Sequence, residues 1–221
     1  MICEFCGAAL EPKTVDVNGR EFVIGHSECE CAEAIKQAEY ASWVENSRKR
    51  YNESKRRMAK IEESRIPERY RSATLENEKL YKTACETGLY IHGGVGTGKT
   101  YIASAIGIRA IQSGRKVRFV KAYELSKQFF ESYDMESVTR PDLLIIDDLG
   151  ADNVSEWANT RMRAVIDDRY GSMKPTVVTS NYSLGALAKK LHTNDDYTAQ
   201  AIVDRLKEMT FTVELSGKSK R

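Results

Sequence analysis

The sequence lacks the features of a membrane or exported protein. No window approaches the ~18 consecutive apolar residues of a membrane span, and the start of the chain, with Cys3, Glu4 and Cys6, lacks the charged-then-apolar layout of a signal peptide. Net charge is nearly balanced, at +2 from 34 basic and 32 acidic residues, so no global charge indicates a polyanionic partner. These absences predict a cytoplasmic protein without membrane contact, whose basic surfaces are local.

Cysteine is scarce beyond the first 31 residues. The chain has five cysteines, and four of them are Cys3, Cys6, Cys29 and Cys31. In a reducing compartment such a set favours a metal site over disulfides. Four soft ligands predict a structural zinc site, with His26 as an alternative to the fourth cysteine; a redox pair and incidental cysteines are the other interpretations.

A β-hairpin is expected between the two cysteine pairs. Two runs rich in β-branched residues, 14–17 and 20–24, flank Asn18-Gly19, the pair that type I′ turns prefer. Such a hairpin would bring the cysteine pairs together. A segment this short cannot build an adequate core, whereas zinc binding supplies ~10–16 kcal/mol that doubles as folding energy. We therefore expect residues 1–31 to form a zinc-binding head.

One long helix is expected after the head. Residues 32–64 contain no proline or glycine and are rich in good helix formers, and Pro67 lies just beyond them. We take 32–65 as a helical linker. Its second half is basic and contains Arg48, Lys49, Arg50, Lys55, Arg56, Arg57, Lys60 and Arg65. This half could bind nucleic acid, could bind an acidic protein surface, or could be only a solvated helix face.

The most specific pattern begins at Leu89, where an apolar strand leads into a glycine-rich loop. Gly93, four further residues and then Gly98-Lys99-Thr100 match the Walker A spacing, the alternative being a glycine-rich turn before a helix. Glycines let backbone N–H groups approach phosphate, and the following helix directs its positive end at the anion. Lys99 would reach the β- and γ-phosphates of ATP, and Thr100 would ligate Mg²⁺. The predicted nucleotide contacts are Gly93, Gly94, Val95, Gly96, Thr97, Gly98, Lys99 and Thr100.

A second apolar run, 142–150, ends in two acids and has the Walker B form. Asp147 is expected to hold Mg²⁺, while Asp148 would orient and deprotonate the water that attacks the γ-phosphate; a pair that only caps a strand is the alternative. Strands and helices alternate here at a spacing that predicts a doubly wound α/β sheet with ligands at the carboxyl ends of its strands.

A polar amide follows the next predicted strand, 176–180. Asn181 could hydrogen-bond the attacking water or the γ-phosphate, as a sensor residue does. The alternative is a helix cap ahead of the helix predicted for 184–191.

These motifs, in this order, closely resemble those of the AAA+ ATPases of the DnaC/DnaI helicase-loader group. The Walker A loop and the segments 143–150, 168–170, 179–181 and 203–206 carry the resemblance. It covers residues 66–221 and implies an AAA+ P-loop domain with a small C-terminal lid. The related IstB transposition ATPases share this core. Loaders of the DnaI type also look similar in the zinc head, whereas IstB proteins resemble this chain only in the body.

The resemblance also implies roles for individual residues. Asn181 matches the sensor I position, and Arg205 matches the arginine finger that completes the site of a neighbouring subunit, which implies self-assembly. A surface arginine paired with Asp204 or Glu208 is the alternative for Arg205. Arg221 matches a sensor II arginine that would contact the nucleotide, or is a frayed tail. Candidates for single-stranded DNA contacts are Lys127, Phe129 and Phe130.

Together these expectations describe an ATP-dependent loader of a hexameric replicative DNA helicase. The zinc head and the basic helix would contact the helicase, and ATP hydrolysis would switch the grip on helicase and single-stranded DNA. Two rival functions are an IstB-like regulator of transposition and a non-hydrolysing adaptor that uses nucleotide only as a latch.

Overall fold

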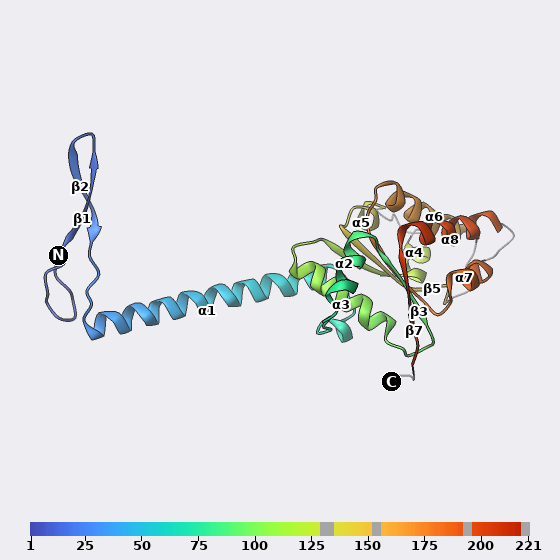
Figure 1. The fold of residues 1–221 in the computed structure, drawn as a ribbon, viewed down its shortest axis with the longest axis horizontal. Coiled ribbons are helices and arrows are strands. Elements are labelled where there is room, and N and C mark those ends of the chain that lie inside the picture. The colour runs from blue at the N-terminus through green and yellow to red at the C-terminus, as the bar shows by residue number, and fades with distance from the viewer. Residues whose placement is uncertain (129–134, 152–155, 192–195, 218–221) are drawn as a thin grey trace. The chain divides into compact units, whose positions relative to one another are not determined.

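The structure, a computed structural model, describes residues 1–128, 135–151, 156–191 and 196–217 (Figure 1). The chain divides into two compact units, residues 1–56 and 57–221. The boundaries expected after residues 31 and 65 stay predictions. None of the described helices combines the length and the apolar character needed to cross a lipid bilayer.

The first unit contains a hairpin followed by a long helix. Strands β1 (Pro12–Val17) and β2 (Arg20–His26) pair antiparallel. They are joined by Asn18 and Gly19, whose φ angles of 58° and 77° are those of a type I′ turn, as the Asn-Gly pair predicts. Helix α1 (Ala32–Glu63) continues into the second unit. It ends before Arg65, whose φ is 61°, a left-handed conformation that no α-helix contains.

The second unit is built on a five-stranded parallel sheet with the order β4-β5-β6-β3-β7. The apolar residues of its inner strands are buried, as expected of parallel strands covered on both faces. The strands are β3 (Leu89–Gly93), β4 (Val117–Lys121), β5 (Leu143–Leu149), β6 (Thr176–Ser180) and β7 (Phe211–Leu215).

Helices cover both faces of this sheet and make a three-layered α/β body (Figure 1). One face carries the turn η1 (Glu68–Tyr70), α2 (Glu78–Glu86) and α3 (Lys99–Gln112). The opposite face carries α4 (Ala122–Gln128), α5 (Glu136–Thr139), α6 (Glu156–Gly171), α7 (Leu184–Leu191) and α8 (Asp196–Met209). Fully buried Tyr90, Ile146 and Val178 of the sheet share a core with Leu187 and Leu206.

The C-terminal part of the chain belongs to this body. Helices α7 and α8 pack in the core of the sheet, and β7 is its edge strand beside β3. The small C-terminal lid implied by the resemblance stays a prediction; α7 and α8 share the hydrophobic core of the second unit.

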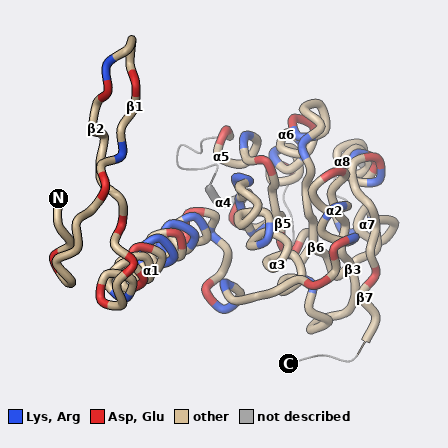
Figure 2. The backbone as a smooth tube through the Cα atoms, turned by 60° about the vertical axis from the view of Figure 1, so that its left-hand side comes forward, with Lys and Arg blue, Asp and Glu red and all other residues tan. Residues whose placement is uncertain are grey.

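The strand order brings three motifs together. Strand β6 lies between β3 and β5, so the ends of these three parallel strands meet at one edge. They lead to the glycine-rich loop, to Asn181 and to the acidic pair Asp147-Asp148. Charged residues of both signs are spread along the rest of the unit (Figure 2), as the balanced composition leads one to expect.

Candidate functional site

The loop between β3 and α3 has the backbone of a phosphate cradle. Gly93, Gly96 and Gly98 have φ angles of 151°, 82° and 94°, which residues with a side chain rarely adopt. At Gly93 a Cβ atom would lie 2.2 Å from the backbone oxygen of Leu215. Helix α3 begins at Lys99, immediately after the loop, so its free N–H groups would face an anion bound in the loop.

Lys99 places its ammonium group over this loop. The side chain is 5% exposed, and its Nζ donates to the carbonyl oxygens of Gly93 and Gly94 at 2.9 and 2.8 Å. Loop carbonyls therefore hold the positive charge beside the cradle. Phosphate oxygens are stronger acceptors than carbonyls, so the arrangement suits the binding of a phosphate chain.

Two oxygens suited to Mg²⁺ lie side by side at the base of the loop. Thr100 Oγ1 donates to Asp147 Oδ1 at 3.0 Å, and Thr179 Oγ1 donates to the same carboxylate oxygen at 2.7 Å. Asp147 is 1% exposed, and burial raises its pKa. A hydroxyl and a carboxylate are the hard oxygen ligands that Mg²⁺ takes, so Thr100 and Asp147 fit the predicted ion.

A distortion of β5 turns Asp148 toward the site. The register between β5 and β6 shifts between Ile146 and Leu149, and Asp148 has a φ of 58°, which is uncommon for a residue with a side chain. The backbone N–H of Asp148 donates to Thr179 Oγ1 at 2.9 Å. Thr179 thus binds the side chain of the first acid and the backbone of the second, and positions both.

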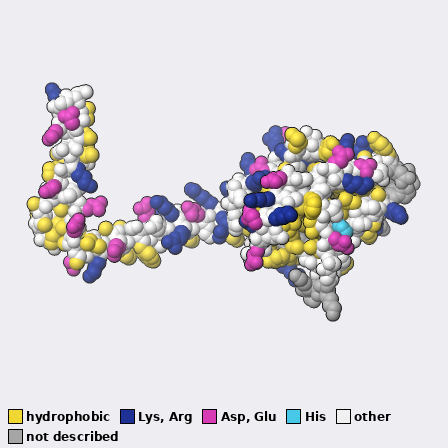
Figure 3. All heavy atoms as spheres, in the orientation of Figure 1, with side chains coloured by type: hydrophobic (Ala, Val, Ile, Leu, Met, Phe, Trp, Pro, Cys, Tyr) yellow, Lys and Arg dark blue, Asp and Glu magenta, His cyan; other side chains and the backbone are white. Residues whose placement is uncertain are grey.

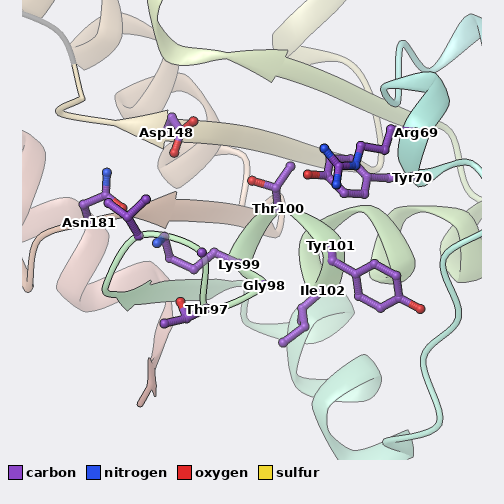
Figure 4. Close-up of a pocket in the computed structure, with 12 residues that line it drawn as sticks. Arg69, Tyr70, Thr97, Gly98, Lys99, Thr100, Tyr101, Ile102, Asp148 and Asn181 are labelled. Carbon is purple, nitrogen blue, oxygen red and sulfur yellow. The ribbon is translucent and has the colours of Figure 1, made fainter. Parts of the chain in front are cut away.

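Lys99, Thr100 and Asp148 line one open cavity of about 680 Å³, a usual size for a small-molecule site, and Asp147 lies behind Thr100. Asp148 and Asn181 lie on the side of the Lys99 amine, whereas Arg69 and Tyr70 lie beyond Thr100 (Figure 4). The cavity therefore has a polar phosphate end and an end with a planar cation and an aromatic ring.

The second end was not predicted from the sequence. Arg69 lies 6.0 Å from the ring centre of Tyr70, and Tyr70 meets Tyr101 edge to face with 6.5 Å between centroids. Planar groups of this kind suit a nucleobase. Arg69 and Tyr70 belong to the short turn η1, which carries no motif, so only their closeness to the loop in space reveals them.

Asn181 lines the cavity and does not cap α7. The cap is Ser183, whose Oγ accepts from the N–H of Ala186 at 3.4 Å. This geometry removes the plain-cap interpretation and leaves the amide beside Asp148 at the polar end. Its sensor role remains a prediction.

Arg205 lies on α8 and is absent from the lining of its own chain's cavity. Its Nε donates to Asp167 Oδ1 at 3.4 Å, and its guanidinium covers the ring of Tyr170 at 4.5 Å. Asp167 is therefore its ion-pair partner, in place of the expected Asp204 or Glu208; Glu208 instead accepts from the Tyr170 hydroxyl. The side chain is 41% exposed, and its finger role stays a prediction.

Four other expected contacts cannot be placed. Phe129, Phe130 and Arg221 lie outside the described residues, as does the side chain of Lys127.

The four cysteines of the first unit form a cluster. Their sulfur atoms all lie within 4.8 Å of one another, with Cys3–Cys31 at 3.9 Å and Cys6–Cys29 at 3.4 Å. Four sulfurs around one zinc at 2.3 Å are about 3.8 Å apart, so the cluster fits such an ion. His26 does not belong to the cluster, which makes Cys31 the fourth member.

The backbone around the first pair favours the thiolate at Cys3, whereas hydrogen bonds with the Cys6 and Cys3 sulfurs raise the pKa of the Cys29 thiol to about 12. Hydrogen bonds from the backbone of Cys6 and Phe5 lower the pKa of the Cys3 thiol to about 7. The thiolate is the form that binds metal. Gly7 has a φ of 72° and donates its N–H to the carbonyl of Cys3, which closes a tight knuckle around the sulfur.

The parallel sheet, the glycine-rich loop and the acidic strand end define a P-loop nucleotide-binding protein. Residues 45–221 match the profile of the IstB-like ATP binding proteins, and the chain belongs to that family.

Among similar proteins are insertion-sequence and replication proteins. The y4uH protein of Sinorhizobium fredii, named as an insertion-sequence ATP-binding protein, is 29% identical over 59% of this chain, which spans 54% of y4uH. The replicative helicase loader DnaI of Bacillus subtilis is 23% identical over 99% of this chain and 76% of DnaI.

A solved structure supports the fold. The crystal structure of DnaI superposes with a TM-score of 0.60 and 24% identity, covering 70% of this chain and 94% of that one.

Proposed function

We propose that the chain is a magnesium-dependent ATPase that loads a hexameric replicative DNA helicase. Lys99, Thr100, Asp148 and Asn181 lie around one cavity, and Asp147 is hydrogen-bonded to Thr100; this arrangement is the observation that carries the ATPase part. Mg²⁺, when bound, would neutralise charge on the β- and γ-phosphates.

Each side chain has a role in this proposal. Lys99 binds the phosphate chain, and Thr100 with Asp147 supplies the oxygens for Mg²⁺. Asp148 accepts a proton from the attacking water at a carboxylate oxygen, and Asn181 orients that water. Since Asp148 lies one residue beyond the Mg²⁺ ligand on a strained backbone, the two acids face different parts of the site.

The assembly part of the proposal concerns Arg205. It is partly exposed and lies away from its own cavity, so it is available to complete the site of a neighbouring copy. That copy would be recruited when several chains gather on a helicase or on single-stranded DNA. The ATPase would then be active only in the assembly.

The loader role is supported by the extent of the alignments. Similarity to DnaI extends over 99% of this chain, and so includes the cysteine head, whereas that to y4uH covers 59%. We propose that the head holds one structural Zn²⁺ on Cys3, Cys6, Cys29 and Cys31. The head and the basic helix α1 would bind the helicase in the cytoplasm, and ATP hydrolysis would release it onto single-stranded DNA.

An IstB-like role in transposition is the second candidate. The family profile and the higher identity to y4uH favour it, although that similarity covers only part of the chain. A non-hydrolysing adaptor is the third, but it would not need Asp148 and Asn181 together at the phosphate end.

One experiment separates these functions. The purified replicative helicase of the source organism is immobilised, and binding of the full chain is measured with ATP, with ADP and without nucleotide. A loader binds with an affinity that depends on nucleotide and deposits the helicase on circular single-stranded DNA. No binding in any nucleotide state, together with nucleotide-dependent binding to duplex DNA and a transposase, would favour the transposition role.

A further inference from the structure

One face of α1 carries uncharged side chains at the spacing of a coiled coil. Within the first unit, Tyr40, Val44, Ser47, Tyr51 and Ser54 follow one another at alternating intervals of four and three residues. This spacing places them in a single row, the a and d positions of a heptad pattern. We call this row the α1 seam.

The large side chains of the α1 seam are open to solvent. Tyr40, Val44 and Tyr51 are 64%, 42% and 68% exposed. Trp43, also 64% exposed, stacks on Tyr40 with 6.0 Å between ring centroids. Figure 3 shows hydrophobic side chains along one side of this helix. A row of exposed aromatic and aliphatic groups is typical of a protein-binding surface.

Basic residues flank the α1 seam on both sides. Arg48 and Lys55 occupy e positions and Arg50 a g position of the same heptads. Within the described part of the chain, no ion pair includes any of these three residues. On the other side of the helix, by contrast, Lys49 pairs with Glu45 at 3.1 Å. The positive charge beside the seam is therefore left for a partner.

This charge pattern selects against a second copy of the chain. In a parallel pair, Arg50 of one copy would face Lys55 of the other. In an antiparallel pair, e positions face e positions and g positions face g positions, so basic groups again meet. Like charges at these positions oppose pairing, whereas glutamates there favour it.

We propose that the α1 seam binds an amphipathic helix of another protein, with apolar residues in its own a and d positions and acidic residues beside them. This goes beyond the helicase-loader role, because it identifies the binding surface and the chemistry of its partner without depending on which protein supplies the helix. It is also independent of the nucleotide site, which uses none of these residues.

Two synthetic peptides test the charge requirement. Both have leucine at every a and d position and are identical elsewhere, except that one has glutamate and the other lysine at every e and g position. Like charges keep each peptide from pairing with itself. By fluorescence anisotropy at low salt, the full chain should bind the glutamate peptide at least about tenfold more tightly than the lysine peptide. The triple variant Arg48→Glu, Arg50→Glu, Lys55→Glu should reverse this preference.

A matched pair of variants tests the apolar row. Val44→Ser should weaken binding of the glutamate peptide about tenfold, because a buried valine is lost from the contact. Ile35→Ser is the control: Ile35 is 46% exposed on the same helix, but lies nine residues from Val44 and so on its opposite face. The control should bind as the unmodified chain does.

Three results would overturn the proposal. The first is equal affinity for both peptides, or equal effects of Val44→Ser and Ile35→Ser. The second is self-association of the full chain, seen by sedimentation and lost in Val44→Ser, which would make the occupant a second copy. In the third, the full chain does not bind the glutamate peptide but binds a single-stranded oligonucleotide, and the triple charge variant no longer binds this oligonucleotide. That result would make the flanks a nucleic-acid site.

Discussion

Replacing Thr179 by valine tests how the two acids are positioned. The change keeps the shape of this fully buried side chain but removes its hydroxyl, which donates to Asp147 Oδ1 at 2.7 Å and accepts from the N–H of Asp148 at 2.9 Å. A hydrogen bond to a charged acceptor contributes about 1.5–3 kcal/mol, and a buried donor without a partner costs about 1–3 kcal/mol. From the lower parts of both ranges, we expect the free energy of unfolding to fall by about 3 kcal/mol.

Chemical denaturation followed by circular dichroism measures this loss. The control is Thr212→Val, at an exposed position of β7, for which we expect a change within about 0.5 kcal/mol. The variant should also lose part of the Mg²⁺-dependent share of its ATP affinity, because Asp147 then keeps only Thr100 of its two hydroxyl donors. A loss below about 1 kcal/mol with unchanged Mg²⁺ dependence would refute the positioning role of Thr179.

The remaining predictions concern the loop, the head and the assembly. Gly93→Ala should lower the free energy of unfolding by more than about 2 kcal/mol, because the new Cβ would meet the backbone of Leu215. Gly185→Ala, in open space on α7, should raise it by about 0.5–1 kcal/mol. Identical denaturation curves for the two variants would contradict this. Elemental analysis should find one zinc per chain, and chelation of the zinc should unfold the head while ATP binding persists. A head that is folded without metal, or a Cys29→Ser variant that binds zinc with full affinity, would argue against the site. The Arg205→Ala and Lys99→Ala proteins should each be inactive alone. Mixed with each other in the presence of single-stranded DNA or helicase, they should recover part of the ATPase rate. Full activity of the Arg205→Ala protein alone would make that arginine structural.

The helices and strands could be predicted because the local residue pattern and the burial of the segment indicate the same secondary structure. Apolar runs specify the inner parallel strands, and the long stretch without proline or glycine specifies α1. In the head, Asn18-Gly19 is enough to predict the turn, since few other residues accept two successive positive φ angles.

Residues of the site could be predicted only where they belong to a short sequence motif with a known spacing. Glycine spacing predicts the phosphate cradle, and two acids near the end of a buried strand predict the proposed Mg²⁺ site. By contrast, Thr179 is one of two threonines in a buried strand, and only the register of β5 against β6 shows that its hydroxyl lies between the acids. Arg69 and Tyr70 reach the cavity through tertiary packing of an irregular segment, which no periodic pattern encodes.

The structural role of Arg169 likewise could not be predicted from the sequence. The sequence presents it only as part of a motif, 168–170, that supports the resemblance. In the structure it is fully buried, and its guanidinium donates to Thr176 Oγ1 and to the backbone carbonyls of Val138, Thr139, Pro141 and Pro175. It joins the segment before β5 to the start of β6, which is a packing role that follows from long-range contacts.

The central claim, that this cavity binds and hydrolyses ATP, is tested most directly by measuring ATP affinity and ATP turnover in the same two variants. Lys99→Ala should lose tight ATP binding, because its ammonium is the charge placed over the loop. Asp148→Asn should bind ATP with near-normal affinity and lose turnover, because an amide cannot accept the proton from water. Normal affinity in Lys99→Ala, or normal turnover in Asp148→Asn, would contradict the account.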